Sequence, residues 1–204
     1  MSANDHSSSD KIFKNLFADD YQVISKPVVF THSFYLSGTI ESADNYTELF
    51  EKIRSAGEND LIRIHINSYG GDLFTAIQFM RVLGETEAQT VASVEGACMS
   101  AATMIFLACS GFEVSAHSMF MFHNYSGGVI GKGGEMFDQL IHERKWSEKL
   151  LRDVYAEFLT EKEFAQILDN KDLWMDGDEV VKRLKKIQVK VSKTKKSLDK
   201  DTDS

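Results

Sequence analysis

Residues 61–94 read LIRIHINSYGGDLFTAIQFMRVLGETEAQTVASV, and this stretch decides the fold class. Its first part, 61–66, predicts a strand that ends in the Gly-containing turn NSYGG at 67–71. Apolar side chains then recur at helical spacing over 73–83, and 90–94 predicts a second strand. A strand, a helix and a strand in this order predict one β-α-β unit of a parallel sheet.

The same alternation of strands and helices continues on both sides of this unit. Further strands are expected at 28–30, 34–36, 112–114 and 119–122, and further helices after the N-cap Ser42 and at 100–109, 135–158, 160–168 and 178–187. We therefore expect an α/β fold in one domain over residues 20–187. The polar N-terminus with its short amphipathic segment, 1–19, and the Lys-rich tail, 188–204, are expected to flank that domain.

Composition limits the classes of function. Of the 204 residues 43% are apolar and 26% are charged, which is typical of a globular protein. The net charge of −8 argues against a body that binds nucleic acid through a general basic field. Residues 1–10 contain no apolar core of a secretory signal, and the apolar stretch 96–109 is too short to cross a membrane.

The two cysteines, Cys98 and Cys109, both lie in the apolar stretch 96–109, which we interpret as one buried helix. They are 11 positions apart, too far along a helix to form a disulfide. No Cys and His residues have the spacing of zinc ligands, so we expect neither a metal nor another cofactor. Together these features predict a reducing, cytoplasmic location.

Two features of the chain carry groups suited to catalysis. The segment Gly96-Ala-Cys-Met-Ser100 places a hydroxyl at the start of an apolar helix, whose first backbone amides are unpaired and can hold an oxyanion. Because four positions separate Gly96 from Ser100, this is not the G-x-S-x-G nucleophile elbow of the α/β-hydrolases. His123 follows the strand expected at 119–122 and precedes a Gly-rich loop, where an imidazole can reach into a cleft.

A serine nucleophile needs a base within hydrogen-bond reach, and that base needs a carboxylate that fixes its tautomer. Taken alone, a His at a strand end is more often a structural hydrogen-bonder than a base. Spacing does not choose among the candidate carboxylates, which are Asp169, Asp172, Asp176 and Asp178.

The order of these motifs resembles the proteolytic subunit of the ATP-dependent Clp protease, the ClpP family of S14-type peptidases. INSYGG at 66–71 is similar to that family's INSPGG, GACMSAA at 96–102 to its G-x-A-A-S-M, MFHNYSGG at 121–128 to its MIHQPSGG, and KDLWM at 171–175 to its RDxFM. The match is collinear from about Phe34 to Met175, and four motifs in order are more specific than any one of them.

The resemblance implies a role for each matching residue. Ser100 would be the nucleophile, His123 the general base and Asp172 the carboxylate that orients it. The backbone amides of Gly70 and Ala101 would form the oxyanion hole. The backbone at Gly71, Gly127 and Gly128 would bind an extended peptide as an added strand.

The resemblance also implies an architecture and partners. The fold would be the spiral β/α fold shared by ClpP and the crotonases, and the long helix at 135–158 would be the projecting handle helix. Two heptameric rings would stack into a tetradecamer around polypeptide substrates, and an AAA+ unfoldase would be a possible partner. The resemblance implies no metal or nucleotide in the peptidase, and no membrane partner.

The chain departs from the family pattern at several positions. Tyr69, Ala116 and Tyr125 stand where family members usually have proline, and Ala101 stands where they favour methionine. Lys171 replaces an arginine that pairs across the rings, and a lysine lacks the bidentate fork of arginine. Beyond about residue 176 the family ending is replaced by DEVVKRLKKI, so the resemblance carries no inference there.

Three alternatives stay open at this point. An enoyl-CoA hydratase of the crotonase type would share the fold but would not need Ser100, His123 and Asp172 together. A non-catalytic accessory subunit of a mixed ring usually loses one of the three. A specialised or ATPase-independent processing peptidase would keep all three and would fit the diverged terminal regions.

Overall fold

The computed structural model describes residues 29–188. The predicted amphipathic segment within 1–19 and nearly all of the predicted tail, 189–204, lie outside the described residues. The domain boundaries at 20 and 187 therefore stay predictions.

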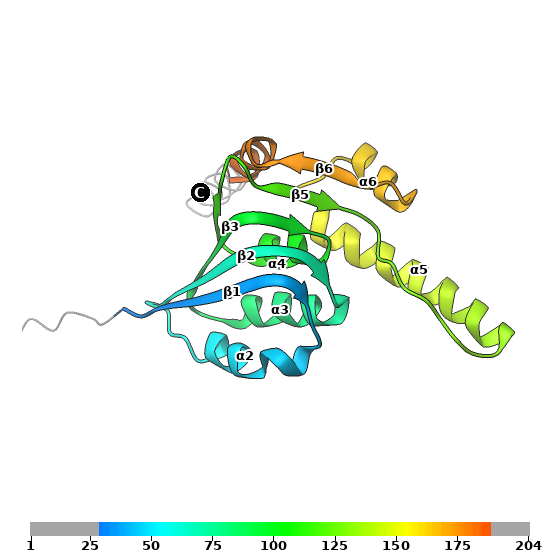
Figure 1. Cartoon of the computed structure of the whole chain (residues 1–204), viewed down its shortest axis with the longest axis horizontal. Helices are drawn as coiled ribbons and strands as arrows, with labels where there is room; N and C mark the ends of the chain where they lie inside the picture. The colour runs from blue at the N-terminus through cyan, green and yellow to red at the C-terminus, as the bar shows by residue number, and fades with distance from the viewer. Residues whose placement is uncertain (1–28, 189–204) are drawn as a thin grey trace, which may run out of the picture.

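One six-stranded sheet forms the centre of the described part of the chain (Figure 1). The strand order is β1-β2-β3-β5-β6, and β4 pairs with β3 beside this path. All pairs are parallel except β5 with β6, which is antiparallel. The strands are β1 (Thr31–Ile40), β2 (Leu61–Gly71), β3 (Gln89–Met99), β4 (Gly111–Val114), β5 (Met119–Phe122) and β6 (Leu173–Asp176). The expected α/β fold with a largely parallel sheet is confirmed.

Helices connect the strands. They are the 3-10 helix η1 (Ala43–Tyr46), α2 (Thr47–Arg54), α3 (Leu73–Glu85), α4 (Ala101–Ala108), α5 (Gly133–Tyr155), α6 (Glu161–Leu168) and a last helix at 177–188. The helices α2, α3 and α4 lie along one face of the sheet, whereas most of α5 extends away from the body (Figure 1). The predicted capping box is present, because Thr160 and Glu163 bond each other's backbone amides at the start of α6.

The core lies between the sheet and the helices on that face. Along β2 the side chains alternate, with Ile62, Ile64 and Ile66 buried toward the helices and Arg63 and His65 on the other face. The helix α4 is apolar almost all round and six of its eight residues are buried, as expected for a helix covered on several sides.

Four local expectations are corrected. Residues 29–30 precede β1 and are not in a strand, and α2 begins at Thr47 after the short η1 instead of directly at the Ser42 cap. Residues 96–99 belong to β3, where Ala97 to Met99 pair with β5, so 96–109 is not one helix. Cys98 consequently lies in β3 and Cys109 directly after α4, and both thiols are free and buried.

The strand β6 was not expected from the sequence. It has four residues, one of them buried, and it has no alternating pattern long enough to mark a strand. Pairing with β5 stabilises it, and this pairing decides where the carboxylates near residue 172 lie.

Candidate active site

Ser100 lies between the end of β3 and the start of α4, with φ 53° and ψ −128°. This is a backbone conformation that residues other than glycine rarely adopt. Hydrogen bonds on both sides hold it: the Ser100 amide donates to the Met121 carbonyl at 2.8 Å, and the Thr103 amide donates to the Ser100 carbonyl at 2.9 Å. The hydroxyl is therefore presented at a sharp strand-to-helix turn.

An irregularity between β2 and β3 sets up this turn. The regular register ends at Ile66 with Val94, and it resumes only at Ser68 with Cys98. Within the gap the side-chain oxygen of Asn67 accepts from the Ala97 amide at 3.0 Å. A Cβ on Gly96 would lie 2.7 Å from that oxygen, so any larger residue there would displace the Asn67 side chain from this position.

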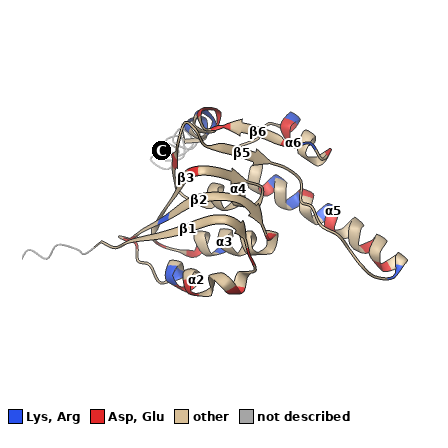
Figure 2. Ribbon diagram, viewed as in Figure 1, with Lys and Arg blue, Asp and Glu red and all other residues tan. Residues whose placement is uncertain are grey.

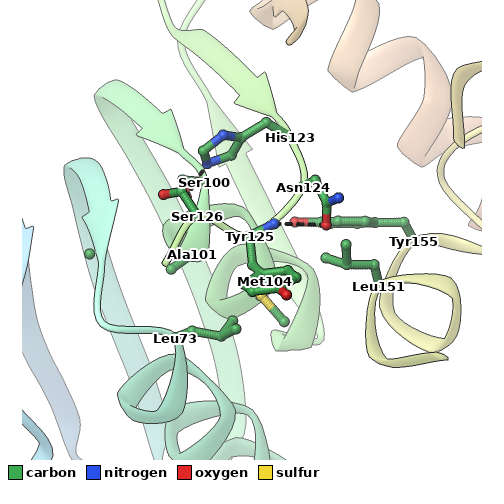
Figure 3. Close-up of a pocket in the computed structure, with 11 residues that line it drawn as sticks. Leu73, Ser100, Ala101, Met104, His123, Asn124, Tyr125, Ser126, Leu151 and Tyr155 are labelled. Carbon is green, nitrogen blue, oxygen red and sulfur yellow. Dashed lines mark hydrogen bonds between the residues drawn. The ribbon is translucent and has the colours of Figure 1, made fainter. Parts of the chain in front are cut away.

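His123 directly follows β5 and reaches back to the serine (Figure 3). Its Nε2 lies 2.7 Å from the Ser100 Oγ, which is a normal hydrogen-bond distance. The neutral imidazole can accept the hydroxyl proton at Nε2 only if Nδ1 carries the ring proton.

The antiparallel pairing of β5 with β6 brings Asp172 to that Nδ1. The outermost pair is Phe122 with Leu173, so His123 and Asp172 are the next residues on their respective strands. The Nδ1 and Oδ1 atoms are 3.8 Å apart, longer than a hydrogen bond, and the Asp172 side chain is half exposed.

The other three candidate aspartates lie elsewhere. Asp176 pairs with Met119 at the opposite end of β6, and Asp169 forms an ion pair with Lys171 at 3.0 Å. Asp178 lies in the helix at 177–188. The register between β5 and β6, which spacing along the sequence does not reveal, therefore distinguishes Asp172 from the other three aspartates as the one beside His123.

Residues 67–71, which were expected to form a turn, are the last part of β2 and pair with β1, and their glycines approach the serine closely. Gly70 has φ 90°, and a Cβ there would lie 2.6 Å from the Ser100 Cβ, so only glycine fits. The Gly70 amide, however, donates to the Ser68 hydroxyl at 3.1 Å. It is Gly71, together with Ala101, that lines the pocket at Ser100.

Two neighbouring depressions lie in this region, and Ser100 lines the smaller one. The smaller one, about 60 Å³, holds Ser100 and His123 and has Leu73, Met104 and Leu151 among its apolar lining residues (Figure 3). The larger one, about 520 Å³, runs between α3 and α5 and includes Gly127 and Gly128 in its wall. Four residues line both depressions: Gly71, Leu73, Tyr125 and Ser126.

Two buried hydroxyls connect the serine turn to α5. Thr103 donates its hydroxyl proton to the Ser100 carbonyl at 2.7 Å and lies 2.7 Å from the Tyr155 hydroxyl, which then donates to Thr103. Tyr155 also packs edge-on against Phe122 with ring centroids 5.5 Å apart. Burial raises the pKa of Tyr155, so its phenol stays protonated and serves as the donor.

Other nucleophiles and metal ligands offer no second site. Burial raises the pKa of the Cys98 thiol well above its ordinary value and that of Cys109 to about 12, so both stay protonated. Within 29–188 no group of three or more His, Cys, Asp and Glu side chains could hold a metal ion.

Sequence reasoning missed the contributions of Thr103, Tyr155, Phe74 and Trp146 to this region. They come from α3, α4 and α5, and each contact joins residues more than 50 positions apart. The apolar patterns of these helices placed the residues on helices but gave no signal of which helices meet.

The fold and the site define a class: a mainly parallel α/β protein with a serine–histidine pair at a strand-to-helix turn beside a groove. The family model described as Clp protease matches residues 22–183, so the chain belongs to the Clp protease family. Family membership supports a ClpP-like peptidase, a hydrolase that acts in proteolysis, and implies oligomeric assembly with possible ATPase partners in general.

Two further findings complete the comparison. No curated protein matches the chain. Among the helices of the described residues, none has the length and apolar character needed to cross a membrane.

Proposed function

We propose that the chain is the serine endopeptidase subunit of a Clp-type protease, with Ser100 as nucleophile, His123 as general base and Asp172 as the residue that orients the base. The observation that carries this proposal is the 2.7 Å contact between Ser100 Oγ and His123 Nε2, with Asp172 next to the far nitrogen of the same ring. This arrangement supports the order of nucleophile, base and carboxylate that acyl transfer requires.

The reaction follows from these positions. The Ser100 oxygen attacks the peptide carbonyl carbon while His123 takes the hydroxyl proton at Nε2. The C–N bond then breaks, and the imidazolium gives that proton to the leaving amine. Water, deprotonated by the same imidazole, hydrolyses the acyl-serine and restores the hydroxyl. The 3.8 Å separation of His123 and Asp172 is compatible with this role, because catalytic hydrogen bonds often tighten only when substrate binds.

The oxyanion of the tetrahedral intermediate needs two donors near Ser100. The Ala101 amide is one, since it opens α4 directly after the nucleophile. Gly70 was the expected second donor, but its amide already bonds the Ser68 hydroxyl. We favour Gly71 for this role, because it lines the same pocket as Ser100 and Ala101. Each such donor contributes roughly 10²–10³ in rate.

Substrate would lie extended along the larger depression. Gly127 and Gly128 line it, and a Cβ on Gly128 would meet no heavy atom of the described chain within 4 Å. Gly71 lines the same depression, and the open backbone at Gly128 suits pairing with an added peptide strand. Main-chain pairing of this kind tolerates many substrate sequences.

Assembly would involve α5. Phe137, Leu140 and Ile141 are 64%, 46% and 40% exposed on the part of α5 that leaves the body. Their spacing forms one apolar stripe, and a second copy of the chain is the simplest partner for it. Stacked heptameric rings enclosing the sites, with an AAA+ unfoldase feeding them, are the full form of this proposal. The free, buried thiols fit a reducing compartment such as the cytoplasm.

The other functions considered have less support. The family match is to Clp proteases, which favours a peptidase over a crotonase-type hydratase. An accessory subunit without activity would not need the serine–histidine contact. A processing peptidase that works without an ATPase shares all site features and differs only in its partner.

The decisive experiment is labelling of the purified full chain with a fluorophosphonate, followed by mapping of the modified residue. We expect modification of Ser100, and we expect hydrolysis of generic fluorogenic peptides that Ser100→Ala abolishes while the protein stays assembled. An assembled, folded protein in which Ser100 is not modified would contradict the proposal.

A further inference from the structure

Two aromatic side chains stack beside the larger depression. Phe74 is the second residue of α3, and Trp146 lies in the middle of α5. Their ring centroids are 5.6 Å apart and their planes differ by 23°, which is an offset-stacked arrangement. Phe74 nevertheless remains 70% exposed, so much of its apolar surface still faces solvent.

These rings line a depression that adjoins the pocket of the nucleophile. The two share four lining residues, so a peptide bound at Ser100 would have its neighbouring residues next to the larger depression. Its volume of about 520 Å³ is large enough for several residues of an extended peptide. Phe74 and Trp146 are thus positioned to meet a substrate side chain away from the scissile bond.

Charge on the wall of the groove adds a second preference. The acidic and basic side chains that line the same depression as the two rings are Asp72, Glu143 and His142, so carboxylates outnumber the one imidazole. Asp72 accepts from the Thr75 amide at 2.7 Å and Glu143 from the Gln139 side chain at 2.6 Å, so both carboxylates are held in place. An acidic substrate side chain would meet two like charges there.

We propose that Phe74 and Trp146 form a substrate subsite that binds an aromatic or large apolar side chain of the polypeptide and disfavours an acidic one. The inference rests on the proposed peptidase function and goes beyond it, because main-chain pairing alone gives no side-chain preference. An extended peptide directs alternate side chains to one side, so a single residue of the substrate would occupy the subsite.

The two rings could instead serve only to brace α5 against α3. Loss of a purely structural contact would lower the stability of the fold and change the cleavage rate of all substrates by the same factor. Loss of a subsite would change the ratio of cleavage rates between substrates. The test therefore compares substrates within each protein variant.

In the kinetic arm, fluorogenic peptides with one fixed scissile bond carry Phe, Ala or Glu at each flanking position in turn. For the wild-type chain we expect one position at which kcat/KM falls in the order Phe, Ala, Glu. Phe74→Ala and Trp146→Ala should lower the Phe-to-Ala ratio at that position about 5- to 10-fold, mainly through KM. Tyr35→Ala removes an aromatic ring that is 71% exposed on β1, outside the groove, and should leave the ratio unchanged.

A binding arm separates the subsite from catalysis. The chain contains two tryptophans, so Trp174→Phe leaves Trp146 as the only indole. In the Ser100→Ala, Trp174→Phe protein we expect the Phe-containing peptide to change the fluorescence of Trp146 at lower concentration than its Ala counterpart. Phe74→Leu, which keeps apolar bulk but loses the ring, should reduce that difference and serves if Phe74→Ala fails to fold.

The outcomes distinguish the two proposals. Cleavage with an unchanged Phe-to-Ala ratio in the Phe74 and Trp146 variants would overturn the subsite and leave the peptidase function standing. Selective binding of the Phe peptide in the Ser100→Ala, Trp174→Phe protein, together with a wild-type chain whose Ser100 is not labelled, would support the subsite and contradict the peptidase function.

Discussion

Ser100 keeps a backbone conformation that costs about 1–3 kcal/mol for a residue other than glycine. Its φ of 53° is one of two positive values among the non-glycine residues of the described chain, the other being 58° at Asn170. Both residues lie near the serine–histidine contact, since Asn170 bonds the Asn124 side chain next to His123. Strain of this kind persists where the surrounding structure fixes the backbone, and here hydrogen bonds on both sides of Ser100 do so.

Asp172 provides the sharpest prediction for a single residue. Asp172→Asn keeps the shape of the side chain but removes the charge that favours the Nδ1-protonated imidazole and its charged form. We expect kcat for peptide hydrolysis to fall roughly 10²–10⁴-fold with little change in KM. Steady-state kinetics on the assembled protein measure this.

Asp169→Asn is the matched control, because Asp169 lies three positions away and forms an exposed ion pair with Lys171. Its activity should stay within a factor of two or so of wild type, as for other exposed pairs. If the Asp169 variant lost activity and the Asp172 variant kept it, the assignment of the carboxylate would be wrong.

Among the elements, the last helix at 177–188 docks through the buried side chains of Val180 and Leu184 and through one ion pair. Arg183 forms two bonds to Glu163 of α6, at 2.7 and 2.9 Å, and its guanidinium lies 5.8 Å from the centroid of the Phe158 ring. Both charged side chains are less than 20% exposed. The Arg183 guanidinium lowers the pKa of Glu163 from 4.5 to about 2.

This lowered pKa predicts how stability depends on pH. A carboxyl with a lower pKa in the folded state stabilises the fold fully above its ordinary pKa and loses this effect as pH falls toward the folded value. Glu163→Gln should therefore lower the free energy of unfolding by about 1–3 kcal/mol at pH 7, with the difference shrinking between pH 4.5 and about 2. Urea unfolding at a series of pH values measures both effects.

Glu161→Gln is the control within the same helical turn. Glu161 pairs with Arg152 at 3.0 Å, but its side chain is 85% exposed, so we expect a change below about 0.5 kcal/mol. Glutamine at 163 can still cap α6, so loss of the cap does not explain the effect. Equal stability of the Glu163 variant and wild type at pH 7 would show that the pair contributes nothing to docking.

At the scale of the whole molecule, the first half of α5 exposes apolar side chains, whereas its last part is buried in the core. Lysines, arginines and acidic residues are mixed along it (Figure 2), while its apolar stripe of Phe137, Leu140 and Ile141 faces solvent. A mixture of both signs does not suit a polyanionic partner, whereas an apolar stripe suits another protein surface.

Phe137→Asp should therefore weaken self-association without unfolding the chain. We expect sedimentation velocity to show a large assembly for the wild type and a shift toward smaller species for the variant, with unchanged circular dichroism. Asp138→Asn changes the neighbouring position of the same helix and should leave the assembly intact. A wild-type chain that is monomeric at every concentration would refute the proposed ring.

Local patterns in the sequence determined the fold class of this protein and several of its helices. The repeated strand and helix periods defined the α/β fold, the apolar run defined α4, and the Thr160 and Glu163 pair defined the start of α6. Each of these depends on residues within a few positions of one another, so the chain carries the information locally. Ser100 and His123 stood out for local reasons too, because Ser100 opens an apolar helix and His123 follows an apolar strand and precedes a Gly-rich loop.

Only the tertiary structure decided the rest. The boundary between β3 and α4 depends on which residues pair with β5, and β6 exists as a strand because β5 lies beside it. The same antiparallel register, and no feature of spacing, puts Asp172 next to His123 while its neighbouring aspartates lie elsewhere. The stack of Phe74 on Trp146 and the bond of Thr103 to Tyr155 likewise join distant segments. Such contacts arise from packing between elements, and a single sequence does not record which elements meet.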